Sequence, residues 1–353
     1  MKILIVSDAW APQVNGVVTA LRALVSQLEQ LGHSVQVLSP QGFRCVPCPG
    51  YAEIPLAWNL WEVGTRIEAF APDCVHLATE GPLGWAARRW LVKRGLAFTS
   101  AIHTRFPEYL HARCPALPLS WGYAWLRRFH RHSSAVLVTS ERMHGTFADR
   151  GFERLARWSL GVDTELFKPA PRGLAAAPVF LYVGRLAAEK NLDAFLGLDL
   201  PGAKWVVGDG PLRGALQARY PDVEFLGYRH GEALAELYRT ASVLVFPSRT
   251  DTLGLVMFEA LACGTPVAAF PVPGPLDVLR DGETGALDID LRKACLRALE
   301  LPREACVRWA AEQGWRASAL RFLALQPALA ATLVDVVADE PAGVYKEPDG
   351  VAG

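Results

Sequence analysis

The chain has 353 residues, of which 51% are hydrophobic, and its 36 basic side chains balance 36 acidic ones. A zero formal charge provides no global field for polyanions, which argues against a nucleic-acid partner. The length favours two domains, because single cores stop growing near ~250–300 residues. No apolar run approaches the ~20 residues of a membrane span, and the run at the start is too short for a signal-peptide core, so we expect a cytoplasmic protein.

The seven cysteines are odd in number and irregularly spaced, which favours reduced thiols over a disulfide framework. Cys45 and Cys48 form a C-x-x-C, but no second ligand pair follows at zinc spacing, and the neighbouring prolines favour a loop there. We therefore expect no metal site.

In the first half, short β-branched runs alternate with helical patterns, which is typical of a parallel α/β sheet. The predicted strands are KILIVS, SVQVLS, CVHLA, FTSAI and AVLVT. Between the first two, Leu21, Leu24 and Leu28 recur at helical spacing, and Gly32 stands where that helix would end. Residues 163–178 then carry three prolines and several alanines, the composition of a linker.

The same pattern restarts in the second half. The predicted strands there are VFLYVG, KWVVG, VEFLG, SVLVFPS and PVAAF. Two doubly wound domains in tandem follow from this pattern. Because open parallel sheets bind ligands beyond the carboxyl ends of their strands, we expect the chemistry in the turns that follow the strands.

Those turns carry groups suited to a diphosphate. Asn15-Gly16 can bring backbone N–H groups and a helix N-terminus against an anion. Arg185 and Lys190 follow the first strand of the second half. The turn GDGPLRG has the spacing G-x-G-x-x-x-G and does not follow the first strand of the chain, so it is not interpreted as a dinucleotide fingerprint.

Two carboxylates eight positions apart, Asp251 and Glu259, lie in SRTDTLGLVMFEALACG. Thr252 is the predicted N-cap of a helix that begins near Gly254 and ends at Gly264. Glu259 then interrupts an apolar helix face, where a carboxylate without a partner is costly. Carboxylates in this position can accept hydrogen bonds from a ribose diol, although Asp251 could also serve only as a complement to the helix dipole.

The motifs PQVNGVVTAL, HTRFPEY, GVDTELFKP, YVGRLAAEKN, VGDGPL and TDTLGLVMFEALACGTPV occur in this order. Together they resemble the retaining nucleotide-sugar glycosyltransferases of family 4, and within them the branch with GDP-mannose-dependent α-mannosyltransferases and glycosyl- or sulfoquinovosyl-diacylglycerol synthases. The resemblance implies the GT-B architecture, two Rossmann-like domains facing across a cleft. The family's E-x7-E motif falls on Asp251 and Glu259, so its first acid is shortened to aspartate.

The resemblance also implies a division of the chain into an acceptor-binding domain and a donor-binding domain. The expected parts are the acceptor domain 1–165, a linker 166–177, the nucleotide-sugar domain 178–308, helices 309–338 that cross back to the first domain, and a poorly ordered tail 339–353. The substrates would be a GDP- or UDP-hexose and the hydroxyl of a lipid or lipid-linked glycan. No cofactor and no metal would be needed, because fixed cations stabilise the departing diphosphate.

Carried over residue by residue, the resemblance assigns roles to individual side chains. Arg185 and Lys190 would bind the donor diphosphate, with Gly16 and Gly208 allowing close approach of the backbone. Glu259 would hold the ribose, while the transferred sugar would contact His103, Asp251 and the backbone of Thr252, Leu253 and Gly254. Tyr228 and Arg229 lie where the base could be read, and neither guanine nor uracil is favoured.

A basic aromatic helix suited to a membrane interface is predicted over residues 119–134. It interleaves Trp121, Tyr123, Trp125 and Phe129 with Arg127, Arg128 and Arg131, and a second basic cluster around Arg88 lies in the same half. Peripheral membrane contact is one interpretation, and ordinary packing and solubility is the other.

Three other functions remain open at this level. The first is a GT-B sugar-nucleotide epimerase. The second is a non-catalytic sugar-nucleotide sensor, which would be expected to lose Arg185, Lys190 or Glu259. The third is an NAD-dependent oxidoreductase, which would need a G-x-G-x-x-G after the first strand.

Overall fold

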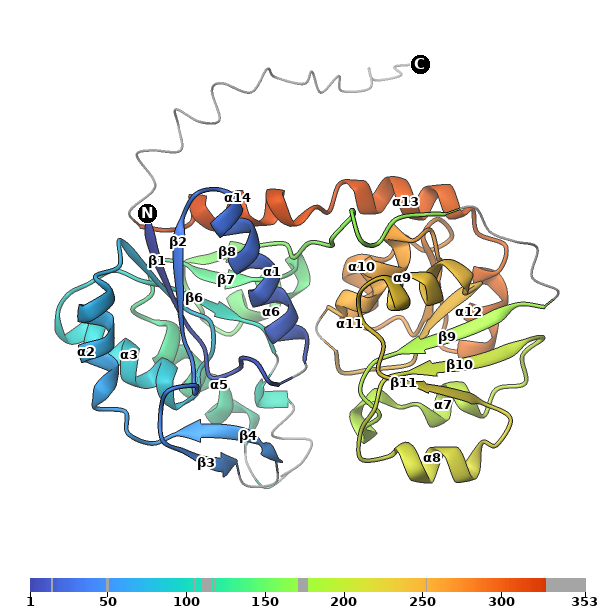
Figure 1. The fold of residues 1–353 in the computed structure, drawn as a ribbon, viewed down its shortest axis with the longest axis horizontal. Helices are drawn as coiled ribbons and strands as arrows, with labels where there is room; N and C mark the ends of the chain where they lie inside the picture. Colours follow the sequence, from blue (N-terminus) through green and yellow to red (C-terminus); the bar gives the residue numbers. More distant parts are fainter. Residues whose placement is uncertain are drawn as a thin grey trace, which may run out of the picture.

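The computed structural model describes residues 1–13, 15–48, 51–104, 106–108, 116, 118–170, 177–251 and 253–327. The chain forms two α/β domains that lie side by side, as Figure 1 shows. Each domain contains a six-stranded parallel sheet with helices against it. The predicted pair of doubly wound domains is confirmed.

The first sheet has the strand order β2-β1-β5-β6-β7-β8. Its strands are β1 Lys2–Val6, β2 Ser34–Leu38, β5 Cys74–Leu77, β6 Thr99–Ile102, β7 Val136–Val138 and β8 Leu155–Arg157. β1 and β5 are buried along most of their length, which explains their continuous apolar runs. A separate antiparallel hairpin joins β3 Cys45–Cys48 to β4 Tyr51–Ala57.

The second sheet has the order β11-β10-β9-β12-β13-β14. Its strands are β9 Val179–Val183, β10 Ala203–Val207, β11 Glu224–Gly227, β12 Val243–Phe246, β13 Val267–Ala269 and β14 Gly285–Leu287. In both sheets the first strand along the chain lies inside the sheet, and the order reverses beside it. These reversals, next to β1 and β9, are the topological switch points at which such sheets bind ligands.

Helices connect successive strands. In the first domain they are α1 Gly16–Gln30, α2 Glu62–Phe70, α3 Pro82–Lys93, α5 Leu119–His130 and α6 Glu141–Ala148. In the second they are the 3₁₀ turn Ala188–Lys190, α7 Asp193–Leu196, α8 Arg213–Arg219, α9 Gly231–Thr240, α10 Leu255–Ala262, α11 Pro273–Val278, α12 Leu291–Ala298 and α13 Arg303–Ala311. α14, Trp315–Ala324, follows α13.

The chain returns to the first domain after α13. α13 packs against α10, whereas α14 packs against α1, so the pair spans both domains (Figure 1). The Trp158 indole donates a hydrogen bond to the Ser318 carbonyl at 3.1 Å, and the Thr99 hydroxyl donates to Gln326 Oε1 at 2.9 Å. Both bonds are buried. They fix the last helix to the first sheet.

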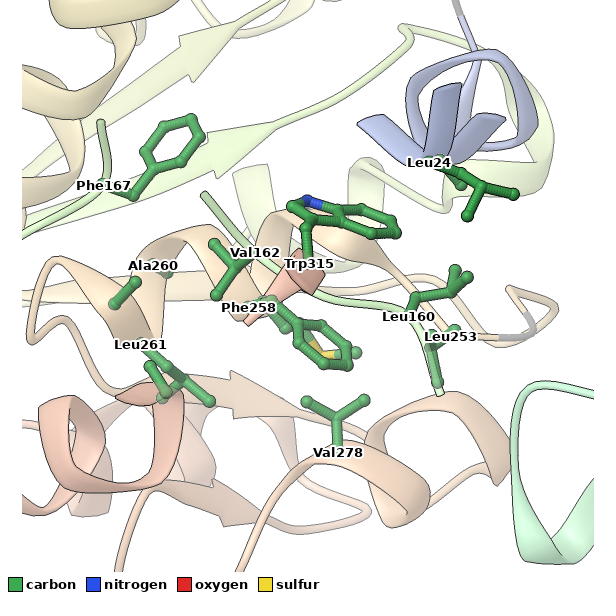
Figure 2. Close-up of a cluster of buried hydrophobic side chains, with 14 of the residues drawn as sticks. Leu24, Leu160, Val162, Phe167, Leu253, Phe258, Ala260, Leu261, Val278 and Trp315 are labelled. Atoms are coloured by element: carbon green, nitrogen blue, oxygen red, sulfur yellow. The ribbon is translucent and has the colours of Figure 1, made fainter. Parts of the chain in front are cut away.

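One apolar cluster runs through both domains. Figure 2 shows part of it, with Leu24 from α1, Leu160 from the segment after β8, Trp315 from α14, and Leu253 and Phe258 from the second domain. Figure 2 also shows the Trp315 ring among these side chains. The domains therefore share a core on the side of the crossing helix.

The structure corrects three details of the prediction. The short edge strands β8 and β14 were not predicted, because their sequences, LAR and GAL, contain no β-branched residue. Cys45 and Cys48 lie on a strand of the hairpin, not in a loop. The cap position of α10 is occupied by Gly254, with φ 80° and no side-chain cap, so the prediction that Thr252 caps this helix is wrong. Thr252 itself and the predicted tail 339–353 lie outside the described residues.

Candidate functional site

The loops after β9, β10, β11 and β12 lie along one edge of the second sheet, because their strands are parallel neighbours. The loop after β9 carries Arg185 and Lys190, and the loop after β12 carries Asp251. The structure thus brings together predicted site residues that are more than 60 positions apart, as the Lys190–Asp251 pairing confirms.

Three glycines allow the loops after β9 and β10 to touch. A Cβ on Gly208 would lie 2.0 Å from the Gly184 carbonyl oxygen, and one on Gly210 would lie 2.5 Å from the Leu186 oxygen. Gly184 has φ 152°, and its own Cβ would meet the Tyr182 hydroxyl at 2.8 Å. The two glycines of the GDG sequence are therefore needed so that this loop can pack against the loop that carries Arg185.

Arg185 lies in the loop after β9, and hydrogen bonds hold the backbone around it. The Tyr182 hydroxyl donates a hydrogen bond to the Arg185 carbonyl at 2.9 Å, and the Leu186 amide donates to the Asp209 carbonyl at 2.9 Å. The backbone on both sides of Arg185 is thus held by hydrogen bonds. Its guanidinium is carried on a fixed segment, as a group that must meet a developing charge requires.

Lys190 forms a close ion pair with Asp251. Its ammonium donates to both carboxylate oxygens, at 2.7 and 2.8 Å, and both side chains are roughly three-quarters buried. Asn191, in the left-handed conformation at φ 54°, donates from its amide to the Pro247 carbonyl at 3.1 Å. These contacts join the loops after β9 and β12, and Lys190 keeps one N–H of its three for another acceptor.

Glu259 lies on the second turn of α10 with Tyr238 of α9 as its partner. The Tyr238 hydroxyl donates to Glu259 Oε2 at 2.8 Å. Burial raises the pKa of Glu259 to about 7, and the hydrogen bond from Tyr238 opposes this rise only in part. A half-protonated carboxyl near neutral pH is unusual and is found most often at functional sites. Sequence reasoning missed Tyr238, because nothing in the pattern links two side chains 21 positions apart.

Tyr228 and Arg229 follow β11, at the outer end of the same sheet edge. The Tyr228 ring is half exposed and stacks on His230, with ring centroids 6.0 Å apart and an interplanar angle of 13°. Arg229 donates to the Tyr228 carbonyl at 3.0 Å. The Tyr228 ring therefore offers an exposed aromatic face at this end of the sheet edge.

In the first domain, Asn15 caps α1: its side chain accepts from the Val18 amide at 3.0 Å. Gly16 is the first residue of the helix, and a Cβ there would meet nothing within 4 Å. The backbone at Gly16 is therefore open toward its surroundings, as close approach to an anion would need.

Asp8, in the loop after β1, was not singled out from the sequence. Its carboxylate accepts from the Leu83 amide at 2.9 Å and the Thr79 hydroxyl at 2.9 Å, so it caps α3. A Cβ on Gly81 would lie 2.3 Å from the Asp8 side chain. Asp8 thus fixes the loop before Gly16 to the neighbouring turn after β5, and its role is positional.

His103 follows β6 in the first domain, with its ring centroid 6.0 Å from that of Trp158. Burial lowers its pKa to about 4, and the charge of Glu80 counteracts this only weakly. The imidazole is therefore neutral at pH 7. It can exchange hydrogen bonds with sugar hydroxyls but cannot act as a cation toward the diphosphate.

The carboxyl ends of the two sheets meet between the domains. Arg142, in the first turn of α6 after β7, lies 3.2 Å from Asp277 of α11, which follows β13. A cavity of about 450 Å³ adjoins this ion pair, with walls from both domains. The turns that follow the strands therefore face each other, as the predicted architecture requires.

A GT-B glycosyltransferase is the class of protein that this fold and this site define. A family model described as "Glycosyltransferase Family 4" matches residues 14–166, and one described as "Glycosyl transferases group 1" matches residues 177–300. The GDP-mannose-dependent alpha-mannosyltransferase of Mycobacterium tuberculosis is 30% identical over 315 residues, covering 81% of this chain and 83% of that protein. The chain belongs to glycosyltransferase family 4.

Two further relatives illustrate the range of this similarity. The alpha-monoglucosyldiacylglycerol synthase of Streptococcus pneumoniae is 26% identical over 349 residues, covering 85% of this chain and 78% of that protein. The solved structure of sucrose-phosphate synthase from Thermosynechococcus elongatus has a TM-score of 0.75 at 20% identity, covering 96% of this chain and all of that one. At this identity, the similarity to sucrose-phosphate synthase shows the fold alone. Neither supports the epimerase alternative.

The described residues contain no group of three or more His, Cys, Asp or Glu side chains arranged to hold a metal ion. Within the same part of the chain, no helix has the length and apolar character needed to cross a membrane.

Proposed function

We propose that this enzyme transfers a hexose of the mannose or glucose type from a nucleoside diphosphate sugar to a hydroxyl of a lipid or lipid-linked glycan, with retention of configuration. The acceptor oxygen bonds to the anomeric carbon while the bond from that carbon to the phosphate oxygen breaks. The acceptor's proton passes to the departing phosphate, on the same face of the sugar.

The observation that carries this proposal is the arrangement at one sheet edge of two cations and a part-buried carboxylate. Arg185 and Lys190 supply fixed positive charge where a leaving diphosphate would accumulate negative charge. Glu259, one helix away, offers Oε1 and Oε2 to a ribose diol, with Tyr238 holding the second oxygen. Because these cations can neutralise the leaving group, we infer that no metal or cofactor is required.

Support for guanine comes from the M. tuberculosis relative, which is named as GDP-mannose-dependent. We infer a GDP-hexose donor, with the base toward Tyr228 and Arg229 at the outer end of the sheet edge. Thermal-shift titration with GDP, UDP and ADP tests this: GDP should raise the melting temperature most. A larger shift with UDP would reassign the donor, and no shift with any of the three would contradict the proposed function.

The stereochemistry of the product and the metal dependence of turnover can each be measured directly. With a donor of α configuration, the anomeric carbon–proton coupling of the product should report an α linkage, and a β product would exclude retention. Turnover should persist in excess EDTA. Loss of activity on chelation, restored by Mg²⁺ or Mn²⁺, would exclude the metal-free mechanism.

We also infer that α5 rests on the surface of a membrane, on the cytoplasmic face. Trp121 is 68% exposed and Trp125 39% exposed, and the Phe106 ring lies 5.9 Å from that of Trp125. Exposed aromatic rings beside arginines suit an interface with anionic lipids. Two other aromatic residues of the predicted face, Tyr123 and Phe129, are buried and take no part in it.

Arg88 also departs from the sequence-based interpretation of a second basic surface cluster. It is buried, and its guanidinium donates to the carbonyls of Phe129 at 2.6 Å and Arg128 at 2.7 Å, at the end of α5. Arg88 therefore supports α5 from inside. Flotation with anionic vesicles should fall on replacing Trp121 and Trp125 together by alanine and not on Ile289→Ala, an exposed site of the other domain. No preference for anionic over neutral vesicles would contradict membrane contact.

A further inference from the structure

His103 follows β6, on the face of the first sheet that α14 covers. Because successive residues of a strand point to opposite faces of a sheet, Thr99 and Ala101 lie on one face of β6, and the same alternation brings His103 to that face. Ala101 belongs to one apolar cluster with Phe322 of α14, whereas Ile102 belongs to another. The imidazole assigned to the transferred sugar therefore lies on the side of the helix that returns from the second domain.

α14 and the turn after it present a stripe of three residues to this face. Ser318, Phe322 and Gln326 recur at intervals of four, which places them on one side of a helix, and all three are buried. The Ser318 carbonyl accepts the hydrogen bond from the Trp158 indole, just after β8 ends. Gln326 accepts the hydrogen bond from Thr99, where β6 begins. The helix is thus fixed to the sheet near both ends of its strands.

Trp158 joins this helix to His103. It is completely buried, and its indole N–H donates to the Ser318 carbonyl at 3.1 Å. The ring lies against Phe322 with centroids 5.7 Å apart, and it meets the His103 ring edge to face at 6.0 Å and 77°. Edge-to-face pairs of this kind depend on the relative orientation of both rings. A displacement of α14 would therefore move the indole, and with it the surface that supports the imidazole.

α14 also fixes a second ring near His103. Thr99 has a single O–H, which it donates to Gln326 Oε1, and the orientation of that amide follows from its Nε2 donating to the Phe322 carbonyl at 3.1 Å. The proton between His76 Nδ1 and Thr99 Oγ1, 2.8 Å apart, must then come from His76. Burial lowers the pKa of His76 to about 3, and the neighbouring His103 acts in the same direction. His76 is therefore a neutral ring, held in one tautomer by the chain that ends on Gln326.

We propose that Trp158 is a positioning residue for the transfer reaction: through its indole, α14 determines how the His103 imidazole faces the transferred sugar. The inference rests on the proposed function, because that function gives His103 its contact with the sugar. It makes the returning helix a part of the catalytic scaffold, in addition to joining the two domains.

Replacing Trp158 by phenylalanine tests the link by kinetics. The variant keeps an aromatic ring but loses the indole N–H and its bond to Ser318. The release of GDP from GDP-mannose with water as the acceptor gives kcat without knowledge of the natural acceptor, and kcat should fall about tenfold or more. GDP affinity, measured by calorimetry, should stay unchanged, because Arg185 and Glu259 lie in the other domain. A merely structural role would lower the melting temperature without this separation.

Trp205→Phe is the matched control for that variant. Trp205 lies in β10 of the second domain, and its indole nitrogen is buried and makes no hydrogen bond within the part of the chain that the structure describes. The substitution makes the same change of side chain without removing such a bond. It should therefore keep kcat and GDP affinity at their wild-type values.

Gln326→Leu tests the link from the far end of α14. It keeps the size of the side chain and removes the acceptor of the Thr99 hydroxyl, while Trp158 stays in place. In ligand-free protein with isotope-labelled histidine, the NMR signals of the His103 ring, assigned by their loss in His103→Gln, should shift in this variant and in Trp158→Phe. Gln217→Leu, at an exposed glutamine of α8, should leave them unchanged.

Two results would overturn the inference. One is a normal kcat per folded molecule in Trp158→Phe, or a kcat that falls only in step with GDP affinity. The other is an unmoved His103 signal in Gln326→Leu, since α14 would then not govern the ring. If the wild type itself released no GDP from GDP-mannose, the proposed function would be contradicted, and the NMR signals of the ligand-free protein would still decide whether α14 positions His103.

Discussion

Lys190 donates to both carboxylate oxygens of Asp251, at 2.7 and 2.8 Å, across the gap between the loops that follow β9 and β12. In this arrangement one ammonium orients the carboxylate predicted to hold the sugar and keeps a third N–H for the diphosphate. The pair therefore couples the two proposed roles: the position of the acid proposed to bind the sugar depends on the cation proposed to bind the leaving group.

Replacing Lys190 by methionine should lower kcat/KM by ~10²–10³-fold, the usual cost of removing one preorganised donor to a developing oxyanion. The loss should appear mainly in kcat, since the missing interaction strengthens as the bond to phosphate breaks. Steady-state kinetics with the GDP-sugar measures it.

Lys293→Met is the matched control for that variant, because Lys293 is an exposed lysine on α12 of the same domain. It should leave the kinetics unchanged. Near-normal turnover of Lys190→Met with an unaltered melting temperature would exclude Lys190 from the chemistry.

Nucleotide affinity should depend on pH through Glu259. Its pKa is raised to about 7 by burial, so the carboxyl gains a proton as the pH falls through 7. Protonation removes acceptor capacity from the group predicted to bind the ribose diol. GDP should therefore bind more weakly at pH 6 than at pH 8, as measured by calorimetry. 2′,3′-Dideoxy-GDP, which lacks both hydroxyls, should show a flatter pH profile, and identical profiles for the two nucleotides would contradict the assignment.

The raised pKa of Glu259 also affects the stability of the folded protein. The folded state holds the Glu259 proton more tightly than the unfolded chain, whose carboxyl has the ordinary pKa of 4.5. Glu259 therefore lowers the stability of the ligand-free protein as the pH rises from 4.5 to about 7, and the cost persists above that. Glu259→Gln, which keeps an oxygen for Tyr238, should raise the melting temperature at pH 8 and weaken GDP binding.

At pH 4 the carboxyl of Glu259 is protonated in both the folded and the unfolded state, so the stabilising effect of Glu259→Gln should vanish there. Glu312→Gln, on the exposed surface after α13, should have no effect at either pH. A melting temperature of Glu259→Gln below that of the wild type at pH 8 would mean that the carboxylate has a stabilising partner not accounted for by Tyr238.

The sequence predicted the fold well because its strands are buried on both faces. β1 and β9 read as continuous apolar runs, and the alternation with helices determined the parallel topology. β8 and β14 could not be predicted in the same way, because these short edge strands, LAR and GAL, contain no β-branched residue. The return of α14 to α1 depends on contacts such as Trp158 with Ser318, which lie 160 positions apart.

The site was predictable only where residue type alone carries the chemistry. Arg185, Lys190 and Asp251 stood out as charged groups in turns after buried strands, and Glu259 stood out as an acid within an apolar helix face. Their partners did not, because Tyr238 and Asp277 act through pairings that exist only once α9, α10, α11 and α6 are packed. The cap at Gly254 was missed for a related reason: tertiary packing against Phe246, which a Cβ there would meet at 2.8 Å, decided the position.

Gly208 should be irreplaceable, although no chemistry is assigned to a side chain there. Gly208→Ala places a Cβ 2.0 Å from the Gly184 carbonyl oxygen, at φ 127°. Backbone strain of this kind costs ~1–3 kcal/mol, and its relief must move the loop that carries Arg185. The variant should therefore lose melting temperature and GDP affinity together.

Gly214→Ala is the control for Gly208→Ala. Gly214 lies in α8, and a Cβ there would meet nothing within 4 Å. Within α8, alanine is favoured over glycine by ~0.5–1 kcal/mol, so this control should be neutral or stabilising and bind GDP normally. If Gly208→Ala melted lower but kept full GDP affinity, the loop after β9 would not be part of the nucleotide site. The glycine would then serve folding alone, and Arg185 would lose the structural argument for its place beside the diphosphate.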